Sequence, residues 1–388
     1  MKMCLGLASP IDRHEKTPLL EAVGRVAARS IRAPANVPPY ERAAMDGYAV
    51  RAQDTYGAGK FSPKTLRLIE KLYANSVPKK TVRPKSCSEV ATGSLLPKGA
   101  DAVVMVERTE THADKVLVYE PVHPAEHVAK VGEDLRRGDL AITGGEVLTP
   151  SKIGALAALG MATVEVYQRP QVSVLTTGDE VVRPPRKIRR GEVYDINAFT
   201  LASVVGENGG VATLFPPVKD TAQAIRGALR KSLRSDLVVF AGGSSVGERD
   251  LIMDVLREEG ELLFHGIAVK PGKPTVLGKM AGKAVLGMPG YPTSCLSNAY
   301  MMLVPMLRQM ARLPPRRDRM VTLRLSKRIV SAIGRVEFYT VRVEGILAVP
   351  AYKESSAITS MAHSDGYIKI PANVDLLEKD EEVEVTLF

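Results

Sequence analysis

Tryptophan is absent from the sequence, and aromatic residues make up only 5% of its 388 residues. Stacking platforms for single-stranded nucleic acid are therefore not expected. The chain also lacks an apolar run of 18 residues, which a membrane-spanning helix needs, and its first ten residues contain no apolar stretch typical of a signal peptide. We expect a cytoplasmic protein that binds neither nucleic acid nor membranes.

Cysteine is also scarce. Cys4, Cys87 and Cys295 are odd in number, far apart in the sequence and never arranged as CxxC. This pattern excludes a disulfide framework and a cysteine-based zinc site, and it favours a reducing compartment. Each cysteine is more typical of a small buried residue than of a nucleophile.

One sequence pattern of a zinc site does occur. His123, Glu126 and His127 match H-x-x-E-H, an inverted zinc-peptidase motif that requires a helix to place both histidines on one face. Pro121 and Pro124 disfavour a helix here, and no third ligand is evident. We therefore expect no zinc site in this segment.

Positive charge predominates. Lysine and arginine number 53 against 43 aspartates and glutamates, which gives a net charge of +10. The excess favours an anionic partner such as a phosphorylated small molecule, although it also occurs in proteins that bind none. The basic run at 183–190 (RPPRKIRR) has two prolines and no aromatic residue, so it fits a solvated loop better than a nucleic-acid patch.

The first half of the chain combines predicted helices with a β-rich region. Apolar residues at helical spacing predict a helix over 13–32, and a proline-rich segment ends it. Residues 40–132 hold short apolar runs separated by Gly, Pro and Asp, which indicates strands. A further helix is predicted over 151–159, with Ser151 as its cap and Gly160 as its stop.

The second half alternates strands with helices, which predicts a parallel sheet covered by helices on both faces. The strands are expected at 172–175, 237–240 and 284–286, and the helices at 197–208, 221–231, 248–258 and 293–312. Beyond a proline-rich linker at 312–319, alternating apolar and polar residues over 320–388 predict a small all-β domain or barrel.

Three turns near the expected strand ends suit a ligand. The loop 242–247 (GGSSVG) leads from a buried strand into a helix, and its backbone N–H groups suit an anion such as phosphate. Lys270 and Lys273 flank a Pro-Gly turn, and 287–292 (GMPGYP) is a second rigid turn. Open α/β sheets bind ligands at such strand ends, although each motif alone also fits a plain turn. Neither the dinucleotide pattern GxGxxG nor the P-loop pattern occurs.

Carboxylates lie beside glycines in three places. These are Asp46, the pair at 133–134, and the pair Asp179 and Glu180 after a predicted strand. Carboxylates at strand ends can hold Mg²⁺ around a phosphorylated ligand, although each alone also fits a turn or a helix cap.

Taken together, these motifs resemble the molybdopterin molybdenumtransferase family, which includes the bacterial and archaeal MoeA proteins and the E domain of gephyrin. Eight motifs occur in the family's order, and the C-terminal β region also fits, so the resemblance covers nearly the whole chain. The matching stretches are 44–50 (AMDGYAV), 91–107 (ATGSLLPKGADAVVMVE), 132–134 (GED), 175–182 (LTTGDEVV), 194–197 (YDIN), 241–250 (AGGSSVGERD), 269–275 (VKPGKPT) and 287–294 (GMPGYPTS).

The resemblance implies an α/β plus β fold: an elongated multidomain chain that forms homodimers. A three-layer α/β/α molybdopterin-binding domain with a parallel sheet joins a β-rich domain and a C-terminal β-barrel. The implied boundaries are 1–33 with 133–169 for a discontinuous N-terminal linker domain, 34–132 for the β-rich domain, 170–312 for the molybdopterin-binding domain and 313–388 for the barrel.

The implied activity is a step of molybdenum cofactor biosynthesis. Molybdate, or tungstate, is inserted into adenylylated molybdopterin with release of AMP and assistance from Mg²⁺. The molybdopterin adenylyltransferase is a further candidate partner. A molybdopterin adenylyltransferase is also an alternative identity, but it shares only the α/β domain. A non-catalytic scaffold is a second alternative, but it would have no need of the lysines and carboxylates that this chain keeps.

The resemblance also implies roles for residues. Lys270 and Lys273 are expected to hold the oxyanion, while Asp46, Thr92 and Asp134 complete the catalytic cleft from the partner subunit. Metal ligands are expected at Asp179, Glu180 and Asp250. Substrate contacts are expected at Gly242, Gly243, Ser244, Ser245, Gly247, Pro271, Gly272, Pro289, Gly290, Pro292, Asp195, Asn197, Arg335, Ser355 and Ser356.

The chain departs from the family's pattern in three places. It has GYP at 290–292 where Gly-Asn-Pro is usual, DIN at 195–197 where Asp-Ser-Asn is usual, and YT at 339–340 where a basic pair is usual. We expect Tyr291 to be compatible with function because its neighbours keep the turn rigid, with its side chain packed or hydrogen-bonded where the asparagine usually lies.

Overall fold

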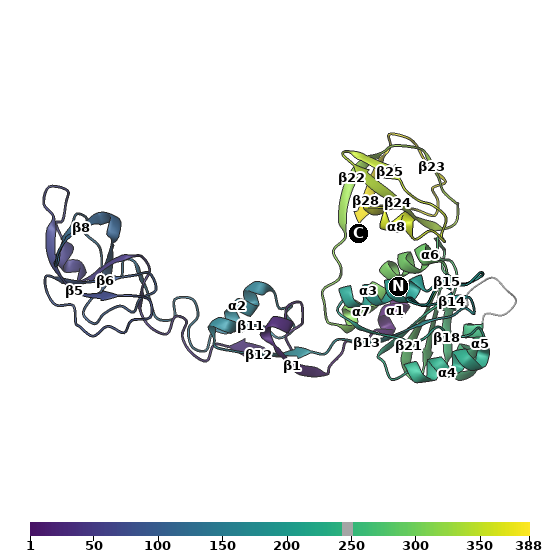
Figure 1. Ribbon diagram of the computed structural model, residues 1–388. Helices are drawn as coiled ribbons and strands as arrows, with labels where there is room; N and C mark the ends of the chain where they lie inside the picture. Colours follow the sequence, from purple (N-terminus) through teal and green to yellow (C-terminus); the bar gives the residue numbers. More distant parts are fainter. Residues whose placement is uncertain (243–250) are drawn as a thin grey trace. The chain divides into compact units, whose positions relative to one another are not determined.

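The computed structural model describes residues 1–242 and 251–388 (Figure 1). They form two compact units. Unit 1 comprises Met1–Glu15, Gly24–Val26 and Val166–Phe388, and unit 2 comprises Lys16–Val23 and Ala27–Glu165. The finer division into four domains stays a prediction.

Unit 2 is built around a six-stranded sheet with the order β7-β4-β6-β5-β9-β8, which confirms the predicted β-rich region. Strands β5 and β6 are parallel, and the other neighbours are antiparallel. Tyr48, Val50, Leu66, Val104 and Val116 pack together in its core. The strands are β4 (Gly47–Val50), β5 (Lys64–Leu72), β6 (Ser86–Val90), β7 (Ala102–Met105), β8 (Thr109–His112) and β9 (Lys115–Val118).

Short elements complete this part of the chain. Strand β2 pairs with β11, and β3 pairs with β10. Their bounds, with those of neighbouring elements, are β1 (His14–Pro18), η1 (Leu19–Glu21), β2 (Ile31–Arg32), β3 (Arg42–Ala43), η2 (Ala52–Thr55), η3 (Val106–Arg108), β10 (Val128–Ala129), β11 (Leu140–Ile142), α2 (Pro150–Ala158) and β12 (Thr163–Tyr167).

The predicted helix over 13–32 is wrong, because the structure has two short strands and one 3₁₀ turn there. Pro18 lacks the N–H that a helix interior needs, and Gly24 takes a left-handed φ of +76° that ends helical geometry. Leu20, counted as part of an apolar helix face, is 91% exposed. Helical spacing alone therefore misled the prediction.

Helix α2 begins earlier than predicted. The Thr149 side chain accepts a hydrogen bond from the Lys152 N–H at 3.4 Å, and Pro150 occupies the first helical turn. Ser151 as the cap is therefore wrong. The predicted stop is confirmed, since Gly160 has a φ of +74° just after the helix.

Unit 1 contains the predicted α/β sheet, with the order β16-β13-β17-β21-β20-β18. The first four strands are parallel, and β20 runs antiparallel to both of its neighbours. The strands are β13 (Gln171–Thr176), β16 (Val211–Leu214), β17 (Leu237–Ala241), β18 (Glu261–His265), β20 (Val276–Met280) and β21 (Lys283–Met288), and a separate pair is β14 (Val181–Val182) with β15 (Val193–Tyr194).

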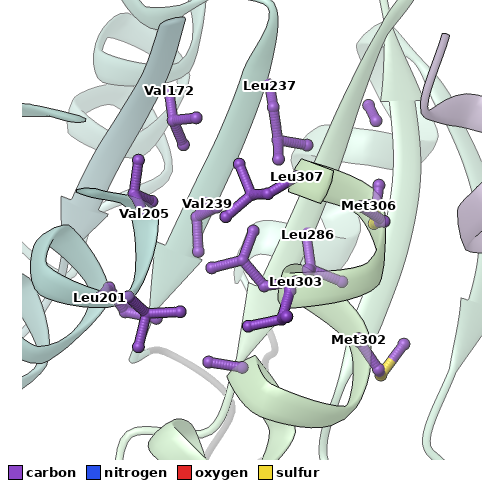
Figure 2. Packing of buried hydrophobic residues seen from close by; sticks show 14 of the residues in the cluster. Val172, Leu201, Val205, Leu237, Val239, Leu286, Met302, Leu303, Met306 and Leu307 are labelled. Carbon is purple, nitrogen blue, oxygen red and sulfur yellow. The ribbon is translucent and has the colours of Figure 1, made fainter. Parts of the chain in front are cut away.

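Helices cover both faces of this sheet. On one face, Val239 and Leu286 of the sheet pack against Leu201, Leu303 and Leu307 of the helices (Figure 2). On the other face, α4 and α5 pack against alternate residues of the same strands. The helices are α1 (Lys2–Leu7), α3 (Ile196–Glu207), α4 (Ala222–Ser232), α5 (Leu251–Glu259), α6 (Pro292–Asn298), the π-helical η4 (Ala299–Leu303) and α7 (Val304–Met310).

The C-terminal region is a closed barrel, as predicted. Its strands run in the order β24-β25-β22-β28-β26, and pairing of β26 with β24 closes the ring. The elements are β22 (Arg319–Leu325), β23 (Ile329–Val330), β24 (Val336–Glu344), β25 (Leu347–Pro350), α8 (Thr359–Ala362), β26 (Gly366–Ile370), β27 (Leu376–Leu377) and β28 (Glu382–Leu387).

Among the described residues, no helix is long and apolar enough to cross a bilayer.

Candidate functional site

Four predicted site segments of unit 1 meet at one edge of the α/β sheet. Thr176, Ala241 and Met288, the last residues of β13, β17 and β21, lie level in the strand register. Strand β20 begins beside the end of β21, since Val276 pairs with Gly287. The turn 270–274, which precedes β20, therefore opens at the same edge as the turns that follow the three parallel strands.

Gly242 begins the glycine-rich loop in a conformation that only glycine adopts readily. Its φ is +108°, and a Cβ built on it would lie 2.7 Å from the carbonyl oxygen of Thr177. Its N–H donates to the Met288 carbonyl at 3.3 Å, so Gly242 is held beside the end of β21. The other predicted loop residues, Gly243, Ser244, Ser245, Gly247 and Asp250, lie outside the described residues.

A buried asparagine of α6 fixes the turn 270–274 by hydrogen bonds. The Asn298 Nδ2 donates to the Gly272 carbonyl at 2.8 Å and to the Thr275 Oγ1 at 2.6 Å. Gly272 has a φ of +112°, and a Cβ there would lie 2.4 Å from the Asn298 Nδ2. Pro271 and Gly272 are buried, so the turn is a packed and rigid structure.

The two lysines of this turn differ in their surroundings. The Lys270 Nζ lies 3.0 Å from the Oε1 of Glu337, a carboxylate of the barrel. Lys273 is exposed, and within the described residues it has no ion-pair partner. Among the described residues, Lys273 is thus the lysine of the turn whose charge no carboxylate compensates.

The third turn, which contains Pro289, Gly290 and Pro292, is tied to the start of α3. The Asn197 Nδ2 donates to the Gly290 carbonyl at 2.7 Å. We expected the Tyr291 side chain to be packed or hydrogen-bonded at the turn; it is 63% exposed, so it is not packed there. The tyrosine presents its ring to solvent at the edge of the sheet.

Asp195, predicted to contact substrate, has protein partners for both carboxylate oxygens. Its Oδ1 caps α3 by accepting from the Ala198 N–H at 3.0 Å. Its Oδ2 accepts from the Thr176 hydroxyl at 2.7 Å and from the Arg183 Nε at 3.0 Å. Asp195 therefore fixes the start of α3 and the start of the basic loop at 183–190 through these hydrogen bonds.

Three carboxylates gather after β13. The Asp220 N–H donates to the Asp179 Oδ1 at 3.4 Å. Partial desolvation, and then the negative charges of Asp179 and Glu180, raise the pKa of Asp220. All three side chains remain exposed, so water screens much of this repulsion. In the part of the chain that the structure describes, no three acidic, histidine or cysteine residues are arranged as a complete metal site.

The barrel brings its predicted residues to the same edge. Val269 pairs with Val336, which places the exposed Arg335 beside the strand that leads into the lysine turn. The Thr293 N–H at the start of α6 donates to the Ser355 carbonyl at 3.1 Å, and Ser356 follows in the same turn. The roles of these three residues in substrate binding stay predictions.

The predicted site residues of unit 2 are Asp46, Thr92 and Asp134, all of which are exposed. The Asp46 Oδ1 accepts from the Thr92 N–H at 2.6 Å and from the Thr92 hydroxyl at 2.8 Å. These hydrogen bonds lower the pKa of Asp46, so its exposed side chain stays ionised at neutral pH. Asp134 is also exposed, and its N–H donates to the Val37 carbonyl at 3.0 Å.

The segment with the H-x-x-E-H pattern contains turns and no helix, as Pro121 and Pro124 predicted. The expected burial of the cysteines is also confirmed. Desolvation raises the pKa of Cys87 to about 12 and raises that of Cys295 as well. Neither thiol is a nucleophile at neutral pH.

Sequence reasoning missed three residues of this site. Asn298 holds the lysine turn, Glu337 pairs with Lys270, and Asp220 joins the acidic cluster. Asp220 alone had a local signal, because it follows a parallel strand that neighbours β13. The other two contacts join residues that are 26 and 67 positions apart, and no local pattern encodes them.

Comparison with protein-family models finds matches along most of the chain. Residues 1–160 match the MoeA N-terminal region (domain I and II), and residues 173–309 match the probable molybdopterin binding domain. Residues 322–388 match the MoeA C-terminal region (domain IV).

Curated proteins and solved structures agree with these matches. The chain is 31% identical to the molybdopterin molybdenumtransferase of Haemophilus influenzae, over 95% of this chain and 93% of that protein. It is 30% identical to molybdopterin molybdenumtransferase 2 of Mycobacterium tuberculosis, over 92% and 91%. The molybdopterin biosynthesis MoeA protein of Pyrococcus horikosii superposes with a TM-score of 0.83 at 38% identity, over 100% and 98%. The chain therefore belongs to the MoeA family of molybdopterin molybdenumtransferases.

Proposed function

We propose that this chain acts in molybdenum cofactor biosynthesis by inserting molybdate or tungstate into adenylylated molybdopterin and releasing AMP. The observation that carries the proposal is the meeting of the glycine-rich, lysine and Pro-Gly turns with the carboxylates at one sheet edge. Such an edge, outside the carboxyl ends of parallel strands, is where open α/β sheets bind ligands.

Lys273 supplies the charge that draws in the oxyanion substrate. A close pair of unit charges is worth about 4 kcal/mol at an effective dielectric constant near 20. Backbone donors at a helix start add roughly 0.3–1 kcal/mol. The lysine charge therefore dominates oxyanion capture, and the rigid turns set the geometry around it. The predicted roles of Pro271, Gly272 and Gly290 in substrate binding fit this arrangement.

The carboxylates after β13 fit a bound Mg²⁺. After desolvation, the negative charges of Asp179 and Glu180 contribute to the raised pKa of Asp220, and a cation would relieve that contribution. Mg²⁺ usually takes only one or two carboxylates and completes its shell with phosphate oxygens and water, so a complete protein site is not required. Of the predicted ligands, Asp179 and Glu180 would contribute one or two carboxylates to the ion, together with Asp250. The ion would neutralise phosphate charge.

We further propose that the enzyme is a cytoplasmic homodimer with a shared cleft. Asp46 is an exposed carboxylate fixed by Thr92, and Asp134 is a second exposed carboxylate. These residues lie in unit 2, whereas the lysine turn lies in unit 1. In a dimer, unit 2 of one subunit would complete the cleft of its partner.

The function is tested with the purified full chain, adenylylated molybdopterin and Mg²⁺, with and without molybdate or tungstate. We expect AMP release that depends on the oxyanion. Binding of adenylylated molybdopterin without AMP release would indicate a non-catalytic scaffold. Consumption of ATP with free molybdopterin would indicate an adenylyltransferase.

A further inference from the structure

We propose that Glu337 of the barrel is a positioning residue that makes the two lysines of the turn unequal. Glu337 holds Lys270 and compensates its charge, so that Lys270 joins the turn to the barrel and Lys273 is the lysine of the turn that attracts the oxyanion. This inference rests on the proposed function and assigns the barrel a part in it.

The surroundings of Glu337 are those of an ordered buried carboxylate. Glu337 is 1% exposed. Its Oε2 accepts from the Ser331 hydroxyl at 2.8 Å and from the Ala332 N–H at 3.4 Å. Its Oε1 lies 3.0 Å from the Lys270 Nζ. Both oxygens are therefore held, and the carboxylate cannot turn away from the lysine without losing buried hydrogen bonds.

The main chain strengthens this connection. The short strand β19 (Val269–Lys270) runs parallel to β24, with Val269 opposite Val336 and Lys270 opposite Glu337. The Val336 N–H also donates to the Ala268 carbonyl at 3.0 Å. The barrel thus orders the residues that enter the lysine turn, while Asn298 orders the turn itself from α6.

The charges at the turn follow from this arrangement. The Lys270 side chain is 36% exposed, and its ammonium lies against the Glu337 carboxylate, so an approaching dianion meets a nearly neutral pair. Lys273 is exposed and, among the described residues, has no such compensation. Of the two lysines, Lys273 therefore contributes more to the field that attracts an oxyanion.

The first test replaces Glu337 by glutamine, which keeps the size and the hydrogen-bond acceptor but removes the charge. Without that charge, Lys270 becomes a second free cation, so the half-saturating molybdate concentration should fall by roughly 3- to 10-fold. The maximal rate of AMP release should fall at the same time, because the turn is held less firmly. A purely structural glutamate would lower the rate and raise the half-saturating concentration together.

The matched control is Glu344→Gln. Glu344 lies on the same strand, and its side chain is 54% exposed beside Arg342. This variant has the same charge change and should leave both kinetic constants within about 2-fold of the wild type. Direct molybdate binding, measured by equilibrium dialysis on the wild type and both variants, gives the same comparison without turnover.

The second test is a thermal double-mutant cycle. Lys270→Met leaves the Glu337 carboxylate buried without its cation and should lower the Tm clearly. Lys270→Met combined with Glu337→Gln should recover most of that loss, whereas Lys273→Met should leave the Tm unchanged. The cycle thus measures the coupling within the pair even if the glutamine variant loses some stability.

The outcomes separate this inference from the proposed function. A wild type that binds molybdate but releases no AMP contradicts the proposed function alone. A working wild type whose Glu337→Gln variant shows unchanged constants, or weaker use of molybdate, overturns the inference alone. Equal Tm losses for Lys270→Met and Lys273→Met would also overturn it.

Discussion

At the scale of single residues, the environments of similar side chains differ more than their positions in the sequence suggest. Lys270 and Lys273 are three residues apart, yet one faces a buried carboxylate and the other faces solvent. Cys87 is a thiol whose burial removes its reactivity. We therefore expect exposed Lys273 to respond to substitution through its charge, and buried Cys87 to be unreactive.

Lys273→Ala should weaken oxyanion use without affecting the fold. Removing one full charge close to a dianion, with screening by water, costs roughly 2–3 kcal/mol, so half-saturating molybdate should rise about 30- to 200-fold. Binding of adenylylated molybdopterin should weaken less, and the Tm should hardly move, because the side chain is exposed. The measurement is AMP release across a molybdate titration, with Lys231→Ala, another exposed lysine of unit 1, as the control. An unchanged titration curve would leave Lys273 as an ordinary solvated residue.

Cys87 should resist alkylation in the native protein. Its pKa is raised to about 12, and only the thiolate is nucleophilic, so at pH 8 nearly every Cys87 is protonated as well as buried. Iodoacetamide labelling followed by mass spectrometry should modify Cys87 in urea but not in buffer. Labelling of the native protein at a comparable rate would show that this strand opens readily.

Sequence patterns predicted the site residues whose signals lie within a few positions of one another, and missed those that act through contacts between distant segments. The lysine turn and the Asp179–Glu180 pair were visible because glycines, prolines and charges stand close together after predicted strands. Glu337 and Asn298 were not visible, since each acts through a contact between distant segments. A buried glutamate in an alternating strand looks like any solvent-facing position until its partner is known.

At the scale of elements, the turns at the sheet edge are the parts that tolerate least change. The lysine turn packs Gly272 directly on Asn298, leaving no room for a side chain. The turn after β21 has the opposite character at Tyr291, which is exposed. The two turns should therefore respond differently to substitution.

Gly272→Ala should displace the lysine turn. A Cβ would lie 2.4 Å from the Asn298 Nδ2, so turn or helix must shift, and a shift near 1 Å costs about 100-fold in rate. Gly282→Ala is a matched control, because Gly282 also has a left-handed φ but no neighbour within 4 Å of a built Cβ. The two variants are compared by AMP release and by Tm. If both lose activity equally, backbone strain and not the contact with Asn298 is responsible.

Tyr291→Asn should stay folded and change turnover by less than about 10-fold. The tyrosine side chain is exposed, and the turn is held through the Gly290 carbonyl. Steady-state AMP release and circular dichroism of the variant provide the measurement. A gain above about 100-fold corresponds to about 2.7 kcal/mol of activation free energy. Such a gain would mean that the tyrosine impairs an otherwise competent enzyme.

The elements themselves were predictable where two signals agreed. Strands β13, β17 and β21 combine apolar runs with following turns, and their parallel order follows from the intervening helices. The segment 13–32 had apolar spacing alone, and Pro18 and Gly24 within it outweighed that spacing. Breakers inside a periodic segment thus deserve more weight than the periodicity.

At the scale of the whole molecule, we propose that residues of unit 1 and residues of unit 2 contribute to the same catalytic cleft. Asp46, ionised and fixed by Thr92, belongs to unit 2, and Lys273 belongs to unit 1. Neither unit alone contains all the predicted catalytic residues. A shared cleft in a symmetric dimer would bring Asp46 of one subunit to the lysine turn of the other.

The most direct measurement is AMP release after mixing the Asp46→Ala and Lys273→Ala variants, at a molybdate concentration far below the half-saturating value of Lys273→Ala, where each variant alone is nearly inactive. Random exchange makes half of the dimers mixed, and each mixed dimer has one intact cleft of two, so activity should recover to about a quarter of the wild type. A label on one variant verifies that subunits exchange. If exchange is complete and activity stays at the level of the separate variants, each cleft is formed within one chain and the shared-cleft account is contradicted.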